Sequence, residues 1–96
     1  MVIGVCQVEL LIAEASSIKD KRRVVRSVVQ RLRSKFNVAV AEVEGLDSWY
    51  SARLGIVCVS NESSHAASMI SSVLAWLEAE RMDAEIGAVS TSVEVW

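Results

Sequence analysis

The sequence predicts an α+β domain whose elements run strand, helix, strand, strand, helix, strand. Three observations lead to this class: alternating apolar residues near the start and in the middle, two segments with helical apolar periodicity, and a turn-forming stretch between the middle strands. The chain has 96 residues, of which 52% are hydrophobic, so one core is expected. We therefore expect a single domain over residues 1–96.

The first strand is expected from Val2 to Ile12, because core-type and other residues alternate there. Its core face carries Gly4, Cys6, Val8 and Leu10. A helix follows, with Ser17 as its N-cap, Asp20 three residues on as a variant of the capping box, and an end near Lys35. The apolar stripe of this helix consists of Ile18, Val25, Val28, Val29 and Leu32.

A hairpin is expected next. Residues 37–43 are rich in Val and Ala, residues 44–48 have turn chemistry, and the segment from Trp49 to Val59 alternates again. The second and third strands should therefore pair through a loop of about five residues.

The second helix should open at Ser60 or Asn61 and run to about Glu80. Its core face is made of Ala66, Ile70, Val73, Leu74 and Leu77. Met82 and Asp83 then form a connection. The last strand spans Ala84 to Trp96, and one of its faces carries Val89, Thr91, Val93 and Val95.

This order is that of a ferredoxin-like, or split βαβ, sandwich, in which a four-stranded antiparallel sheet carries both helices on one face. The other sheet face is then uncovered. Its expected side chains are Val5, Gln7, Glu9 and Leu11 from the first strand and Trp49, Ser51, Arg53 and Val57 from the third. A second subunit or a ligand could sit on this face.

Charge and composition exclude several classes of protein. The net charge is −2 and the isoelectric point is near 5.3, so the chain as a whole is not a strongly basic nucleic-acid binder. The first basic residue is Lys19, and the longest uncharged stretch covers 15 residues and contains five serines, so we expect no secretory signal and no membrane span. A cytoplasmic protein with Cys6 and Cys58 as buried free thiols is expected.

No motif of a known chemistry is present, so we expect a protein that is not an enzyme and holds no metal or cofactor. The sequence has no GxGxxG, GxxxxGK[ST] or HExxH, and no Cys or His pair spaced for zinc. His65, the single histidine, has no Ser, Cys or Asp at a spacing typical of nucleophilic catalysis. The third strand also lacks the aromatic residues with which other split βαβ domains stack on RNA bases.

The first predicted helix is strongly basic. Between Lys19 and Lys35 there are eight basic residues and one acidic residue, a local charge of +7. One stripe opposite the core face contains Lys19, Arg22, Arg23, Arg26 and Arg33, with Gln30 among them. Cations also crowd the helix N-terminus, where the macrodipole disfavours them and a phosphate would be stabilised. The candidate RNA- or phosphate-binding residues are therefore Lys19, Lys21, Arg22, Arg23, Arg26 and Arg33.

Three interpretations of the basic helix stay open: a solvated face paired with acids such as Glu14, Glu44 or Asp47, a surface for RNA or another polyanion, and a surface for an acidic protein. A second candidate site lies on the open sheet face and comprises Glu9, Glu42, Trp49 and Arg53. These residues could hold a small ligand or pair two subunits as a homodimer, or form a structural ion network. Neither membrane binding nor sequence-specific DNA binding is expected.

Several segments occur together in order. They are GVCQVEL at 4–10, SIKDKRR at 17–23, RLRSKFNV at 31–38, AEV at 41–43, Asp47, Trp49, LGI at 54–56 and VSN at 59–61. Over essentially the whole chain they resemble the YlxP-like family of small bacterial proteins, a domain of unknown function. The resemblance implies a ferredoxin-like fold and a bacterial cytosolic setting. Many relatives have Gln where this chain has Tyr50.

Genes of this family commonly lie beside those of translation initiation and ribosome-maturation factors, and the family has no agreed catalytic residues. The resemblance therefore makes ribosomal or precursor RNA the expected polyanion. We expect a non-enzymatic accessory protein that binds RNA or the ribosome through its basic helix. The alternative is an oligomeric interaction or regulatory module that uses the open sheet face.

Overall fold

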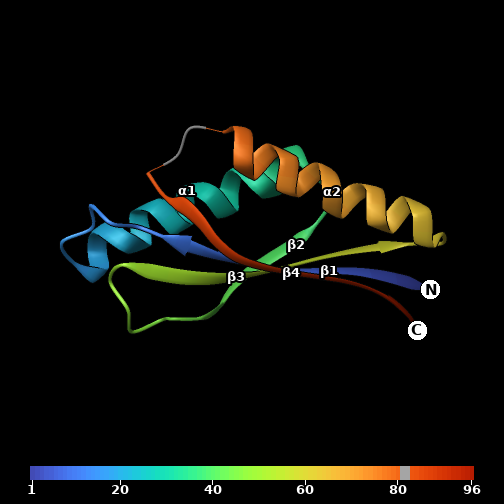
Figure 1. Ribbon diagram of the computed structural model, residues 1–96, viewed down its shortest axis with the longest axis horizontal. Helices are drawn as coiled ribbons and strands as arrows, with labels where there is room; N and C mark the ends of the chain where they lie inside the picture. The colour runs from blue at the N-terminus through green and yellow to red at the C-terminus, as the bar shows by residue number, and fades with distance from the viewer. Residues whose placement is uncertain (81–82) are drawn as a thin grey trace.

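A computed structural model describes residues 1–80 and 83–96. The elements follow one another as β1 (Val2–Leu11), α1 (Ile18–Lys35), β2 (Ala39–Glu44), β3 (Ser51–Ser60), α2 (Ser63–Ala79) and β4 (Glu85–Val95). The four strands form one antiparallel sheet in the order β2-β3-β1-β4, and both helices lie on one face of it (Figure 1). The predicted ferredoxin-like sandwich is confirmed. Of the predicted connection, Met82 lies outside the described residues.

The core lies between the helices and the two central strands. Alternate residues of β1 and β3 point toward the helices, and among them Cys6, Val8, Leu10, Leu54 and Ile56 have no exposed surface. The helices contribute Val25, Val28, Leu32, Ala66, Ile70, Val73 and Leu77. The thiols of Cys6 and Cys58 are free and buried, as expected, and burial raises the pKa of the Cys6 thiol.

The turn between β2 and β3 is longer than predicted, and Trp49 does not belong to β3. The Ser48 hydroxyl accepts hydrogen bonds from the backbone N–H groups of Tyr50 and Ser51, at 3.4 and 3.2 Å. Gly45 allows the turn with a φ of 82°. These bonds hold Trp49 in the turn, and Tyr50 directly precedes β3, where its carbonyl oxygen accepts a hydrogen bond from the backbone N–H of Ile12 at 2.7 Å. The exposed fractions of Trp49 and Tyr50 are 46% and 59%.

The second helix begins at Ser63, later than predicted. The Ser60 hydroxyl accepts a hydrogen bond from the backbone N–H of Glu62 at 3.1 Å and lies 3.0 Å from Nδ1 of His65. Ser60 therefore organises the turn before the helix instead of acting as its N-cap. No helix in the described part of the chain is long and apolar enough to cross a membrane.

Candidate functional site

Lys21 does not belong to the predicted phosphate-binding surface. Its side chain has no exposed area, and its ammonium group donates hydrogen bonds to Oε2 of Glu42 at 2.7 Å and to the carbonyl oxygen of Gly45 at 2.8 Å. The cause is its position, because Lys21 lies four residues before the buried Val25 and so on the core face of α1. Ile18, which the apolar stripe included, is 37% exposed instead.

Glu42 was expected on the open sheet face, and this assignment is wrong. It lies opposite the buried Leu54 in the β2–β3 register, which places it on the helix side of the sheet, within reach of Lys21. A register shift between Glu42 and Glu44 then brings Glu44 opposite Arg53. The ion pair on the open face accordingly joins Nε of Arg53 to Oε2 of Glu44, at 3.7 Å.

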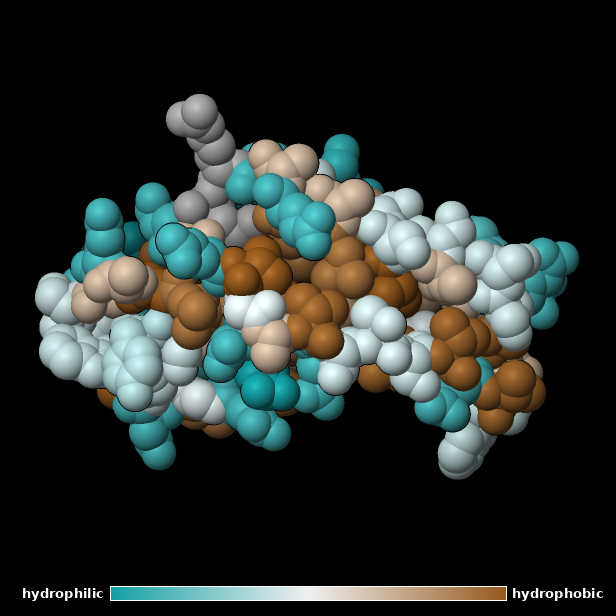
Figure 2. All heavy atoms as spheres, viewed as in Figure 1, coloured by the Kyte–Doolittle hydropathy of each residue, from teal (hydrophilic) through white to brown (hydrophobic). Residues whose placement is uncertain are grey.

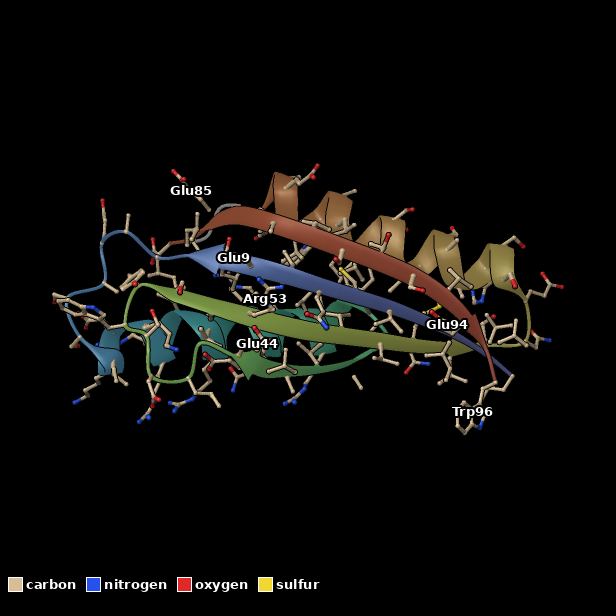
Figure 3. The ribbon with its side chains drawn as sticks, turned by 60° about the horizontal axis from the view of Figure 1, so that its bottom comes forward. Glu9, Glu44, Arg53, Glu85, Glu94 and Trp96 are labelled. Carbon is tan, nitrogen blue, oxygen red and sulfur yellow. The ribbon has the colours of Figure 1, made fainter. Side chains whose placement is uncertain are left out.

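The open face carries a row of charged side chains across three neighbouring strands (Figure 3). Glu9 lies opposite Arg53 in the β1–β3 register, and Oε1 of Glu9 accepts a hydrogen bond from the backbone N–H of Ala88 at 3.3 Å. Gly87 leaves room for this contact, since a Cβ there would collide with the Glu9 carboxyl group. Glu9 thus links β1 to β4 and Arg53 links β3 to β2, while no ion pair joins Glu9 to Arg53 among the described residues.

The second predicted site is therefore not assembled as expected. Of its four residues, only Glu9 and Arg53 share the open face, because Glu42 faces the helices and Trp49 lies in the turn. Among residues 1–80 and 83–96, no group of three or more His, Cys, Asp or Glu side chains could hold a metal ion.

The other five predicted cations do form an exposed surface on α1. This basic stripe consists of Lys19, Arg22, Arg23, Arg26 and Arg33. Arg23 lies 3.4 Å from the carboxylate of Asp20, and Arg33 donates a hydrogen bond to the carbonyl oxygen of Val40 at 2.7 Å. Within the described residues, the charged groups of Lys19, Arg22 and Arg26 have neither an ion pair nor a hydrogen bond.

The acidic residues that the sequence offered as partners form no ion pair with the stripe. Glu44 pairs with Arg53. Glu80 of the α2 C-cap, which the sequence did not single out, pairs with Arg31 at 3.6 Å, outside the stripe. Neither Glu14 nor Asp47 forms an ion pair with any described residue. The stripe therefore keeps most of its positive charge facing solvent.

The N-terminus of α1 is capped from within the chain. The Ser17 hydroxyl accepts a hydrogen bond from the backbone N–H of Asp20 at 3.1 Å, which confirms the predicted cap. The Asp20 carboxylate in turn accepts bonds from the hydroxyl and backbone N–H of Ser16, at 2.8 and 3.2 Å. These bonds, with a smaller contribution from Arg23, lower the pKa of Asp20. The first turn of α1 thus carries a hydrogen-bonded carboxylate as well as cations.

Comparison with known proteins agrees with this sequence pattern. A family profile described as "Protein of unknown function (DUF503)" matches residues 3–91. The chain belongs to the DUF503 family. A relative from Bacillus subtilis (strain 168), "Uncharacterized protein YlxP", is 33% identical over 76 residues, which cover 79% of this chain and 83% of the relative. The predicted YlxP-like resemblance is confirmed, and the DUF503 match includes all of α1 and its basic stripe.

Proposed function

We propose that this DUF503 protein is a non-enzymatic accessory protein of the cytoplasm that binds RNA, on the ribosome or its precursors, through the basic stripe of α1. One observation carries the proposal. The exposed charges of Lys19, Arg22 and Arg26 have no acidic partner among residues 1–80 and 83–96, although the protein is acidic overall.

The dimensions of the stripe suit a polyanion. From Lys19 to Arg33 an α-helix rises about 21 Å, so the side chains can face several successive phosphates of one nucleic-acid strand. A net-acidic protein that concentrates its cations on one helix repels polyanions elsewhere and orients them toward that helix. This asymmetry favours a defined docking direction.

Recognition is expected through phosphates and shape rather than through bases. The open face of the central strands carries aliphatic, neutral polar and charged residues, including Val5, Gln7, Arg53 and Val57, which offer no rings for base stacking. The aromatic residues Trp49 and Tyr50 lie in the turn between β2 and β3. Phosphate contacts position a nucleic acid without reading its sequence, so structured RNA is the expected target class.

The experiment is a binding titration of structured ribosomal RNA and of ribosomal subunits at about 50 to 300 mM salt. If three to five phosphates are contacted, the affinity should fall with a log-log slope of about −2 to −4.5. An RNA affinity that does not change with salt concentration would contradict phosphate recognition. No RNA binding at the lowest salt concentration would overturn the proposal. Binding to an acidic polypeptide but not to RNA would favour an acidic protein partner.

A further inference from the structure

The two edges of the sheet differ in how they are protected. β2 has six residues, contains a register shift and two glutamates, and receives a hydrogen bond from Arg33. β4 has 11 residues, and β1 is its only strand neighbour in the described sheet. Its charged residues are Glu85 and Glu94, and it contains no Lys, Arg or Pro that would discourage a further strand.

Apolar side chains line this free edge. Val89, Val93 and Val95 are 42%, 39% and 78% exposed, and Trp96 beyond the strand is 84% exposed. Figure 2 shows hydrophobic surface along β4 and between it and α2. The three valines point to the helix side, because β4 pairs them with Val8, Gly4 and Val2 of β1.

A groove separates these valines from α2, and its walls carry no charge. It is lined by Ala67, Ile70, Ser71, Leu74, Thr91, Ser92 and Val93. Depletion of charge is typical of the centre of a protein interface, in contrast to the cation-rich surface of α1. The groove and the free strand edge form one continuous surface.

We propose that two copies of this chain pair antiparallel through β4, about a two-fold axis at Thr91, so that their sheets become continuous. This register places Val89 opposite Val93 of the partner subunit, twice, and keeps the helices of both copies on one side. Glu94 then faces Ala88 of the partner subunit, so like charges do not meet. β4 is regular here, since its register shift against β1 lies before Val89.

The self-complementarity of β4 identifies a second copy as the occupant. A two-fold interface requires a surface that is complementary to itself. In this register Val89 faces the partner's Val93, and Ser90 faces the partner's Ser92. The proposal does not rest on RNA binding. The basic helix α1 contacts β2, at the opposite edge of the sheet, so the basic stripe stays exposed in the dimer.

The first test measures the mass of the protein in solution by sedimentation equilibrium over a wide concentration range. Wild type should dimerise, and Val89→Lys, which places two lysines in each interface, should raise the dissociation constant at least about tenfold. The matched control is Val43→Lys on the β2 edge, where the valine is 46% exposed, and it should leave the dimer intact. A wild type that stays monomeric, or a folded Val89→Lys that still dimerises, overturns the proposal.

The second test is disulfide crosslinking, and it decides the case if Val89→Lys fails to fold. Residues directly opposite in an antiparallel pair have a Cα separation that a disulfide can span, so Thr91→Cys should form a covalent dimer on oxidation. Ala41→Cys on exposed β2 is the control and should stay monomeric, since the native thiols are buried. A dimer without a crosslink at position 91, or with one at position 41, overturns the register.

Discussion

Replacing Lys21 by methionine should lower the free energy of unfolding by about 3–5 kcal/mol. Methionine keeps most of the volume of the lysine chain but leaves the carboxylate of Glu42 without its cation and the carbonyl of Gly45 without its donor. The side chain of Glu42 is only 14% exposed, so water replaces the lost ammonium group poorly. Urea denaturation measures the effect as a lower midpoint at an unchanged slope.

Two further variants define the origin of this loss. Arg23→Met breaks the exposed pair with Asp20 and should cost less than about 1 kcal/mol. Lys21→Met combined with Glu42→Leu removes both charges and should recover most of the stability. If Lys21→Met were as stable as Arg23→Met, the buried ion pair would contribute little to stability. If Lys21→Met kept full stability but bound RNA more weakly, Lys21 would belong to the RNA-binding surface.

The double variant Arg22→Glu/Arg26→Glu should lower the affinity for structured RNA at least about a hundredfold at low salt. Both side chains lie on the exposed stripe without an acidic partner in the described structure, so the reversal removes two phosphate contacts and adds two repulsive charges. The fold should be unaffected, because neither charged group contacts the core. Fluorescence anisotropy with a labelled RNA measures the affinity, and circular dichroism verifies the fold.

The open face of the sheet supplies the controls for this experiment. Trp49→Ala and Arg53→Ala change the turn and the charged row, and each should leave RNA affinity within about twofold. If Arg53→Ala removed binding while the double reversal on α1 did not, the sheet face would be the RNA surface and the proposed function of α1 would be wrong.

Element order and face assignment were predictable because strand alternation and helical periodicity are local properties. The same periodicity contained the correct position of Lys21, which shares the core face with Val25 and Val28. The positive charge of Lys21 suggested a surface position, but a lysine can be buried when a carboxylate pairs with its ammonium group. The partner carboxylate belongs to Glu42, 21 residues later in the sequence. Whether the Glu42 side chain faces the helices or the open face depends on how β2 packs in the sheet.

Glu42 alternates regularly with the buried Val40 and therefore faces the helices. Two other differences arise from irregular backbone, and the first is the register shift after Glu42, which brings Glu44 to the open face. Side-chain bonds from Ser48 extend the turn and remove Trp49 from the sheet. The basic stripe was predictable from spacing alone, whereas the pairing of Arg31 with Glu80 depends on how the two helices pack.

The most direct test of the basic stripe compares the salt dependence of RNA binding in two variants with the same net charge. Arg22→Gln/Arg26→Gln removes two of the five positive charges of the stripe, while Ser68→Glu/Ser72→Glu lowers the net charge by the same two units on the exposed side of α2. The first variant should flatten the log-log salt slope by about 1.4 to 1.8, and the second should keep the wild-type slope. If the salt slope flattened equally in both variants, or stayed unchanged in Arg22→Gln/Arg26→Gln, phosphate binding by α1 would be contradicted.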